Sequence, residues 1–234
     1  MISDSLPAFW AVIPAAGVGS RMRADRPKQY LTLSGRTILE HTLACFLDHP
    51  GLKGIVVSLA EDDPFWPQLP CADDARIHRA PGGSERADSV FNALLRLVEL
   101  GADGNDWVLV HDAARPNLAR SDLDNLLAVL AEDPVGGLLA VPARDTLKRA
   151  GPDGRVRETV DRSVIWQAYT PQMFRLAPLQ HALADARVAG VAVTDEASAM
   201  EWAGLAPRLV EGRADNLKVT RPEDLQWLAQ RWGR

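Results

Sequence analysis

Short runs of apolar residues alternate with amphipathic segments along most of the chain, and this alternation limits the folds that the chain can adopt. Residues 8–14, 54–59, 107–111 and 137–141 have the composition of buried strands, rich in Val, Ile, Leu and Trp. Nearly continuous apolar strands separated by helices predict an α/β fold, with a mostly parallel sheet and helices on both faces. Ligands of such sheets bind at the carboxyl ends of the strands. We therefore expect functional residues directly after the apolar runs.

Four of the amphipathic segments have recognisable first turns. Thr37-Ile-Leu-Glu40 is a capping-box pattern, and it predicts a helix that ends near Asp48. Three further helices are predicted over residues 84–100, 121–132 and 220–232, beginning at Ser84, Ser121 and Thr220.

The composition bounds both the size of the fold and the class of partner. The chain has 234 residues, of which 47% are hydrophobic, enough to bury a core without disulfides or a structural metal. Lys and Arg number 26 against 31 Asp and Glu, and this net charge of −5 argues against binding to nucleic acid or to an anionic membrane. Neither a signal peptide nor a long apolar span is evident, so we expect a single domain over residues 1–234 in the cytoplasm.

Residues 144–161 interrupt the alternation of strands and helices. The turn sequence Gly151-Pro-Asp-Gly154 lies between two polar segments of strand-like composition, with too few apolar residues to pack on the main sheet. We expect a β-hairpin arm over residues 142–165 that projects from the domain. Because an isolated hairpin is only marginally stable in water, the arm is expected to pack on a second subunit. An ordinary surface loop is the alternative.

A glycine loop follows the first predicted strand, with the sequence Pro14-Ala-Ala-Gly-Val-Gly-Ser-Arg-Met22. Small residues let the backbone approach a ligand closely, and consecutive amide groups can bind phosphate oxygens. The loop lacks the Lys of a P-loop, and Met22 stands where the dinucleotide-binding fingerprint requires a third glycine. Residues 21–28 carry four basic side chains and one acidic side chain, which suits a polyphosphate. The alternative is a tight turn beside a solvated basic surface.

Asp112 directly follows the predicted strand over residues 107–111. A carboxylate at that end of a strand, facing a phosphate loop, is placed to bind Mg²⁺, which commonly uses one or two carboxylates together with substrate phosphates. Arg115 adds a guanidinium for a second anion. A helix cap is the alternative role for Asp112, and for His111 we expect a hydrogen-bonded core position. The two cysteines and five histidines show no spacing typical of a zinc site.

Three other segments carry polar or charged residues without an evident structural need. Residues 82–89 place two glycines before a helix, and Ser89 lies one turn into that helix. Thr194-Asp-Glu-Ala-Ser198 has the pattern of an N-cap, which is the alternative to a binding role. Lys218 is predicted to lie in a short strand before the last helix.

These segments, taken in order, resemble one known family. They are Pro14-Ala-Ala-Gly-Val-Gly-Ser-Arg-Met22, Pro27-Lys-Gln-Tyr30, Arg86-Ala-Asp-Ser89, Val110-His-Asp-Ala-Ala-Arg-Pro116, Arg144-Asp-Thr146, Thr159-Val-Asp-Arg162, Thr194-Asp-Glu-Ala-Ser198 and Asn216-Leu-Lys-Val-Thr-Arg-Pro-Glu-Asp224. The glycine loop alone would indicate only a sugar-type nucleotidyltransferase. The complete set closely resembles the 2-C-methyl-D-erythritol 4-phosphate cytidylyltransferases of the non-mevalonate isoprenoid pathway, over about residues 9–228.

The resemblance implies a Rossmann-like domain with a protruding β-arm, in a homodimer whose arms embrace. It also implies CTP and 2-C-methyl-D-erythritol 4-phosphate as substrates, with Mg²⁺ bound by Asp112. The nucleotide would contact Pro14, Ala15, Ala16, Gly17, Gly19, Gly82 and Ser89. The acceptor phosphate would contact Arg115, Thr146, Arg162, Thr194 and Lys218. The catalytic residues would be Arg21, Lys28, Arg162 and Lys218, with Thr146 and Arg162 acting in the neighbouring subunit's site.

The implied reaction is attack by the acceptor phosphate on the α-phosphorus of CTP, with release of pyrophosphate. Three other functions stay open from the sequence. A relative that activates another polyol phosphate, such as ribitol 5-phosphate, would share the loop and the metal ligand, and Thr146, Arg162 and Thr194 favour methylerythritol phosphate by resemblance. Met22 argues against a nicotinamide-dependent oxidoreductase. A non-catalytic nucleotide-binding module would have little need for both Arg21 and Lys28 beside the metal carboxylate.

Overall fold

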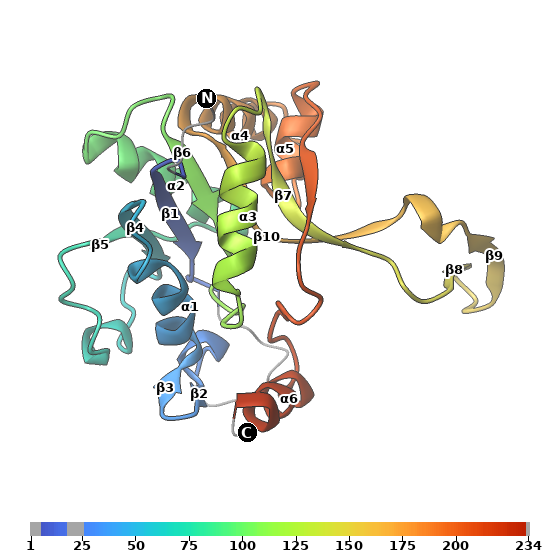
Figure 1. Ribbon diagram of the computed structural model, residues 1–234, viewed down its shortest axis with the longest axis horizontal. Coiled ribbons are helices and arrows are strands. Elements are labelled where there is room, and N and C mark those ends of the chain that lie inside the picture. Colours follow the sequence, from blue (N-terminus) through green and yellow to red (C-terminus); the bar gives the residue numbers. More distant parts are fainter. Residues whose placement is uncertain (1–5, 18–25, 233–234) are drawn as a thin grey trace.

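A seven-stranded sheet forms the centre of the molecule in the computed structural model, which describes residues 6–17 and 26–232 (Figure 1). Its strands in spatial order are β11 (Arg208–Glu211), β7 (Gly136–Pro142), β10 (Trp166–Arg175), β6 (Trp107–Val110), β1 (Phe9–Pro14), β4 (Leu52–Leu59) and β5 (Ile77–Pro81). β10 runs antiparallel to both of its neighbours, and the remaining pairs are parallel. The predicted mostly parallel sheet is therefore confirmed.

Helices cover both faces of the sheet, as the continuous apolar strands predicted. α1 (Ile38–Leu47) and α3 (Arg120–Leu130) pack on one face. α2 (Arg86–Glu99), α4 (Leu176–Val188) and α5 (Glu196–Trp202) pack on the other. Successive residues of β1 serve the two faces in turn, because side chains alternate along a strand. Ile13 lies in the core beneath α1 and α3, and Val12 lies in the core beneath α2 and α4.

The helix starts agree with the sequence patterns to within a few residues. At α1 the predicted capping box is present: Glu40 N–H donates to Thr37 Oγ1 at 3.2 Å, and Thr37 N–H donates to Glu40 Oε2 at 2.7 Å. The predicted start of α2 at Ser84 is wrong, because the N-cap is Glu85. Asp88 Oδ2 accepts hydrogen bonds from both the Glu85 N–H and the Ser84 hydroxyl. A side chain within the first turn of α2 therefore caps the helix, and Ser84 donates to it.

Smaller elements surround the sheet. A two-stranded hairpin, β2 (Thr32–Leu33) and β3 (Arg36–Thr37), precedes α1, and α6 (Pro222–Trp232) ends the described chain. Short 3-10 turns lie at η2 (Lys28–Tyr30), η3 (Trp66–Gln68) and η4 (Arg162–Val164). A third apolar cluster joins α6 to this region through Leu33, Ile38, Ala114, Val219 and Leu228.

A hairpin arm projects from the sheet between β7 and β10 (Figure 1). Its strands, β8 (Leu147–Ala150) and β9 (Val156–Val160), form an antiparallel sheet of their own. Lys148 Nζ donates to Thr159 Oγ1 at 2.7 Å, and Arg149 forms an ion pair with Glu158 at 2.8 Å. Gly154 has φ +74°, the left-handed conformation that this turn requires of a glycine. The predicted hairpin is present, and both strands are largely exposed.

Among the described residues, every helix falls short of the length and apolar character needed to cross a membrane. A cytoplasmic location stays a prediction.

Candidate functional site

The carboxyl ends of β1, β5 and β6 lie at the same edge of the sheet and surround a pocket of about 490 Å³. It is lined by Pro14 at the end of β1, residues 15–17 after β1, residues 83–86 and Ser89 after β5, residues 112–114 after β6, and Lys28, Gln29 and Lys218. Segments far apart in the sequence meet here because parallel strands end at one edge. The pocket unites most of the predicted nucleotide loop, the predicted metal ligand and two predicted catalytic lysines.

Gln29 holds the described part of the glycine loop. Its buried side-chain amide donates to the carbonyl oxygens of Ala15, at 2.6 Å, and Gly17, at 3.1 Å. Ala15 N–H donates to the Ser58 carbonyl at 2.8 Å, which extends the β1–β4 pairing beyond the strand. The sequence did not predict this role for Gln29, because its local pattern does not indicate which backbone oxygens its side chain contacts.

Gly82 and Ser89 connect the turn after β5 to the glycine loop. A Cβ atom on Gly82 would overlap the Cβ of Ala16, so the two backbones can approach this closely only with glycine at that position. Ser89 Oγ accepts from Gly83 N–H at 3.0 Å and donates to the Glu85 carbonyl at 3.1 Å. Ser89 thus lines the pocket, whereas Gly82 lies outside the lining and allows the turn to approach Ala16 closely.

Asp112 is a buried carboxylate with three cationic neighbours. Arg86 Nε lies 3.2 Å from Oδ1, whereas Arg115 Nε and Lys218 Nζ lie 3.2 Å and 3.0 Å from Oδ2. Burial by itself would raise the pKa of Asp112, but the charges of Arg86, Lys218 and Arg115 outweigh it and hold that pKa well below its usual range. Asp112 therefore stays ionised at neutral pH. Its alternative role as a helix cap is wrong, because α3 begins at Arg120 with Ala119 as its N-cap.

His111 has the hydrogen-bonded core position that the sequence predicted. Its Nε2 lies 3.0 Å from the Arg115 carbonyl oxygen and its Nδ1 lies 2.9 Å from Thr170 Oγ1. A carbonyl oxygen can only accept, so Nε2 carries the hydrogen and Nδ1 accepts from the threonine hydroxyl. Burial lowers the pKa of His111 to about 4. The same Thr170 hydroxyl accepts from Asp112 N–H at 3.1 Å, so this neutral imidazole helps to fix the backbone beside Asp112.

The two lysines of the pocket come from separate segments that touch each other. Lys28 Nζ donates to the Val219 carbonyl at 3.1 Å, and Val219 N–H donates to the Ala114 carbonyl at 2.8 Å. Lys218 lies in an irregular segment, so its predicted placement in a strand is wrong. The hydrogen bond from Val219 N–H to the Ala114 carbonyl holds this segment beside the residues that follow Asp112, and it brings Lys218 to the Asp112 carboxylate without a strand pairing.

Arg115 is buried beside Asp112 and contacts protein groups. Its Nη1 donates to the Asn216 carbonyl at 2.7 Å, and its guanidinium lies 4.6 Å from the centroid of the Tyr169 ring. Arg115 therefore connects Asp112, through the ion pair, to the segment that carries Lys218, through the hydrogen bond to Asn216. Acceptor binding by Arg115 stays a prediction.

Four predicted acceptor residues lie outside the lining of this pocket: the buried Arg115, and Thr146, Arg162 and Thr194. Thr146 and Arg162 belong to the arm, where both are exposed and Arg162 Nη1 donates to the Arg144 carbonyl. Thr194 is exposed in the turn before α5, where its N–H donates to Ser198 Oγ at 3.0 Å as part of the N-cap. Gly19 and Arg21 lie outside the described residues.

Arg86 is the main site residue that sequence reasoning missed. It begins α2 and lines the pocket, and its guanidinium contacts both Asp112 and the buried carboxylate of Glu196. Its motif, Arg86-Ala-Asp-Ser89, is one of the segments that carry the family resemblance, but no role followed from it for Arg86. The local sequence gives no sign of a partner as far along the chain as Glu196.

The donor set at the pocket fits a magnesium ion that is carried by a substrate. No cluster of three or more His, Cys, Asp or Glu that could hold a metal occurs among the described residues. Asp112 offers one ionised carboxylate to the pocket, and Mg²⁺ commonly combines one or two carboxylates with phosphate oxygens and waters. The arrangement therefore suits a metal–nucleotide complex.

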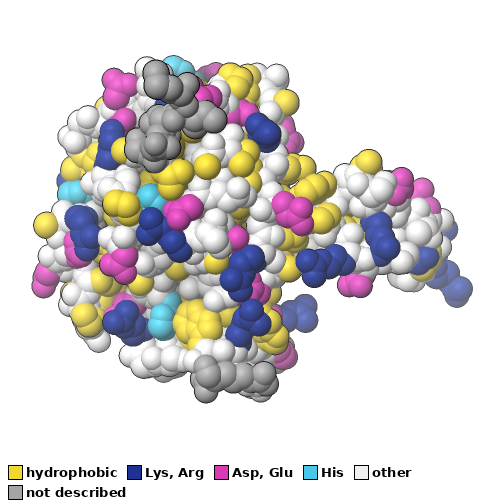
Figure 2. Space-filling view, viewed as in Figure 1, with side chains coloured by type: hydrophobic (Ala, Val, Ile, Leu, Met, Phe, Trp, Pro, Cys, Tyr) yellow, Lys and Arg dark blue, Asp and Glu magenta, His cyan; other side chains and the backbone are white. Residues whose placement is uncertain are grey.

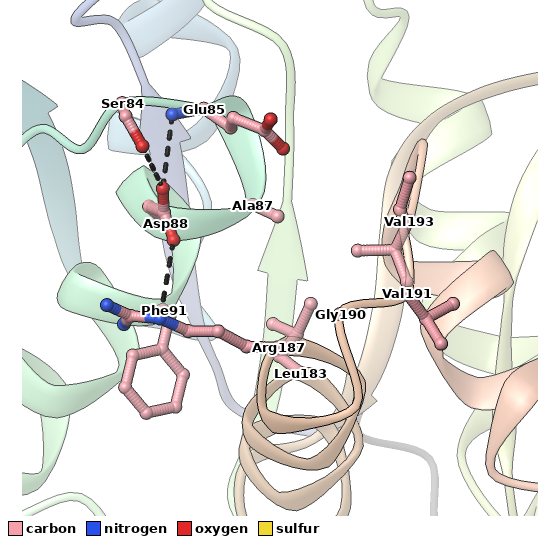
Figure 3. Close-up of a pocket in the computed structure, with 11 residues that line it drawn as sticks. Ser84, Glu85, Ala87, Asp88, Phe91, Leu183, Arg187, Gly190, Val191 and Val193 are labelled. Carbon is pink, nitrogen blue, oxygen red and sulfur yellow. Dashed lines mark hydrogen bonds and ion pairs between the residues drawn. The ribbon is translucent and has the colours of Figure 1, made fainter.

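A second pocket of about 320 Å³ lies between the first turn of α2 and the end of α4 (Figure 3). Ser84 and Glu85 line both pockets. Asp88 in this pocket accepts the Ser84 hydroxyl at 2.7 Å and lies 3.9 Å from Arg187 Nε.

Known proteins resemble this chain over nearly its whole length. The family model described as 2-C-methyl-D-erythritol 4-phosphate cytidylyltransferase matches residues 9–231. Proteins of that name from Pseudomonas entomophila strain L48 and Pseudomonas fluorescens strain Pf-5 are 77% and 76% identical, covering 97% and 99% of this chain and 97% and 98% of their own lengths. The crystal structure of the Francisella tularensis enzyme of that name is 37% identical with a TM-score of 0.82, covering 97% of this chain and 100% of that one. The chain belongs to the 2-C-methyl-D-erythritol 4-phosphate cytidylyltransferase family.

Proposed function

We propose that this protein transfers CMP from CTP to 2-C-methyl-D-erythritol 4-phosphate, giving 4-diphosphocytidyl-2-C-methyl-D-erythritol and pyrophosphate. Membership of the family supports the reaction. The observation that carries the assignment is the single pocket in which the loop after β1, Asp112, Lys28 and Lys218 meet. A triphosphate, a metal and a second phosphate need this combination of amide groups, one carboxylate and fixed cations.

CTP would bind along the glycine loop and the turn after β5. The backbone at Ala15 and Gly17 is held by Gln29, Ser89 lies in the facing wall, and Gly82 allows that wall to approach Ala16 closely. Pro14 ends β1 and places the loop at the edge of the sheet. A preorganised backbone of this kind binds phosphate and base without ordering a loop at the time of binding. Gly19 is proposed to extend the same surface.

Asp112 would hold Mg²⁺ together with the phosphates of CTP. When bound, the metal would offset the negative charge that the phosphates bring together. Arg86 and Arg115 fix the orientation of the carboxylate from opposite oxygens, and the half-exposed Lys218 ammonium shares Oδ2. The carboxylate needs no deprotonation step, because its pKa lies well below neutral pH.

In the proposed reaction an oxygen of the acceptor phosphate forms a bond to the α-phosphorus, and the bond from that phosphorus to pyrophosphate breaks. The attacking group is an oxyanion near neutral pH, so no strong general base is required. The barrier comes from the approach of two anions, and Lys28, Lys218 and Arg21 are proposed to stabilise the charge that develops. Lys218 and Arg162 would also orient the acceptor phosphate for in-line attack.

We further propose that two chains form a dimer through their arms, each arm completing the partner's site. Residues 142–165 carry six Lys or Arg and four Asp or Glu, a net charge of +2 in a chain of −5. Figure 2 shows Lys and Arg side chains along the arm and on the adjoining part of the body. Val156 and Val164 are 61% and 74% exposed, an apolar surface suited to a partner. Thr146 and Arg162 lie on this arm and would act in the partner's site, where they would meet the acceptor together with Thr194 of the partner's body.

Release of pyrophosphate tests the proposed function. The protein is supplied with Mg²⁺ and CTP, and methylerythritol 4-phosphate and ribitol 5-phosphate are offered in parallel reactions. Release that depends on the first acceptor is expected. Release with ribitol 5-phosphate alone would keep the chemistry and contradict the acceptor. No release with either, although calorimetry shows that CTP binds, would contradict the enzyme assignment.

A further inference from the structure

We propose that the ion pair of Arg86 with Glu196, the Arg86–Glu196 bridge, positions the acceptor half of the site against the nucleotide half. The inference rests on the proposed function, because it concerns the same reaction. It assigns both residues as positioning residues, which act by fixing the turn that carries Thr194 relative to Asp112.

The bridge spans three elements at the carboxyl edge of the sheet. Arg86 is the first residue of α2, and Glu196 is the first residue of α5. Arg86 Nη1 and Nη2 donate to Glu196 Oε1 and Oε2 at 2.7 Å and 3.1 Å, a two-pronged contact. The remaining edge of the guanidinium donates from Nε to Asp112 Oδ1 at 3.2 Å. One planar group therefore fixes two carboxylates relative to each other.

The turn before α5 has few other attachments to the nucleotide side. The side-chain amide of Gln172 in β10 contacts this turn twice, since it donates to Asp195 Oδ2 at 2.9 Å and accepts from Ala197 N–H at 2.7 Å. Those contacts hold the turn to the sheet. The bridge adds the lateral contact to α2 and Asp112, and Thr194 lies two residues before Glu196.

Burial makes the geometry of the bridge strict. Glu196 is 1% exposed, so its carboxylate cannot exchange Arg86 for water without a large loss. A lysine at position 86 carries the charge but lacks the planar fork, and it could not serve both carboxylates in the same way. The bridge thus has a requirement for shape in addition to charge.

The nucleotide wall has its own supports. Ser58 Oγ donates to the Ser89 carbonyl at 2.6 Å, and Val90 and Leu94 of α2 are fully buried in the core. Asp112 also keeps its contacts to Arg115 and Lys218 through Oδ2 when Arg86 is replaced. Loss of the bridge should therefore leave CTP binding largely intact and should misplace the acceptor half. This difference separates a positioning role from a general contribution to folding.

The test compares Arg86→Gln, Glu196→Gln and the double variant. Arg86→Gln leaves Glu196 buried without a counter-charge and should lower the Tm by roughly 10 °C. The double variant removes both charges, keeps comparable side-chain volume, and should recover a Tm within roughly 5 °C of the wild type. Its kcat/KM for methylerythritol 4-phosphate should nevertheless stay about 10- to 100-fold low, because a shift of about 1 Å in position can cost that much. Its affinity for Mg²⁺ with CTP, measured by calorimetry, should change by less than about threefold.

Recovery of both Tm and acceptor kcat/KM in the double variant would overturn the proposal, because the pair would then be structural only. An equal loss of CTP affinity would also overturn it. If the double variant stays unstable, Arg86→Lys decides: normal acceptor kinetics there would show that the fork is not needed. Arg187→Gln is the matched control, since Arg187 faces Asp88 in the first turn of α2 (Figure 3) and lines the second pocket, whose lining does not include Asp112. A wild-type protein without activity would contradict the proposed function, not the bridge.

Discussion

Lys218 Nζ lies 3.0 Å from Asp112 Oδ2, although the two residues are far apart in the sequence. The segment that carries Lys218 is fixed by Asn216, whose carbonyl accepts from Arg115 and whose side-chain amide donates to the Thr170 carbonyl at 2.8 Å. Half-exposed lysines are usually mobile, whereas this one is held beside the predicted metal ligand.

Replacement of Lys218 by alanine should lower kcat about 10²- to 10³-fold, by analogy with the loss of one preorganised donor to a developing charge. Pyrophosphate release at saturating substrates measures the effect, and thermal unfolding checks that the fold is intact. Lys53→Ala is a matched control, because the side chain of Lys53 is also 38% exposed and paired with an aspartate, Asp106, at 2.6 Å. Equal kcat values in the two variants would contradict the role of Lys218.

Gln29→Met should weaken CTP binding about tenfold while changing stability less. Methionine keeps the volume and removes the amide that donates to the carbonyl oxygens of Ala15 and Gly17, so the loop loses its support. Calorimetric titration with CTP measures the affinity. Gln68→Met is the control, because exposed Gln68 makes a comparable amide contact to the Pro64 carbonyl away from the pocket. An unchanged CTP affinity would show that the loop holds its shape without Gln29.

The architecture follows from the sequence where one residue type dominates a segment. β1, β4, β6 and β7 were predicted because they are almost uniformly apolar, and the arm was predicted from its Gly-Pro-Asp-Gly turn. β5 and β10 were not predicted. β5 contains His78 and Arg79, and β10 mixes polar residues with a proline at position 171. Both strands are defined by pairing with distant neighbours, which local composition does not report.

The candidate site likewise contains residues that the local sequence predicted and residues that it did not. Residues 15–17 and Asp112 were predicted because each directly follows an apolar strand, a position that parallel sheets use for ligands. Arg86 and Gln29 were not predicted. Their importance depends on partners in other segments, Glu196 and Ala15, and such contacts exist only after folding.

Two glycine variants should separate stability from binding. Gly82→Ala places a Cβ on the Cβ of Ala16, so we expect a lower Tm together with weaker CTP binding. Gly17→Ala meets no described atom within 4 Å, so its Tm should stay close to that of the wild type, whereas the added methyl group would obstruct the approach of CTP. Thermal unfolding and CTP titration of both variants give the comparison. Full CTP affinity in Gly17→Ala would contradict the placement of the nucleotide against this loop.

Stability should fall as the pH drops from about 6.5 towards 4. His111 has its pKa lowered to about 4 by burial, so in this range the unfolded chain binds a proton that the folded chain does not. The resulting loss of unfolding free energy is absent above about pH 6.5 and reaches roughly 3 kcal/mol once the pH falls below about 4. Urea unfolding at several pH values should show a smaller slope for His111→Gln than for the wild type. His181→Gln, at an exposed position on α4, should keep the wild-type slope, and an unchanged slope in His111→Gln would contradict the assignment.

Mixed dimers test whether the arm acts on the partner's site. Arg162→Ala and Lys28→Ala should each be nearly inactive alone. If Arg162 serves the neighbouring subunit, a mixed dimer holds one site with both residues intact, and an equal mixture should recover about a quarter of the wild-type activity after exchange. Pyrophosphate release is measured after subunit exchange, which tagged subunits confirm by co-purification. If the arm served its own subunit, every site in the mixture would carry a defect. Persistent inactivity with exchange confirmed would therefore place Arg162 in its own chain's site and contradict the swapped arrangement.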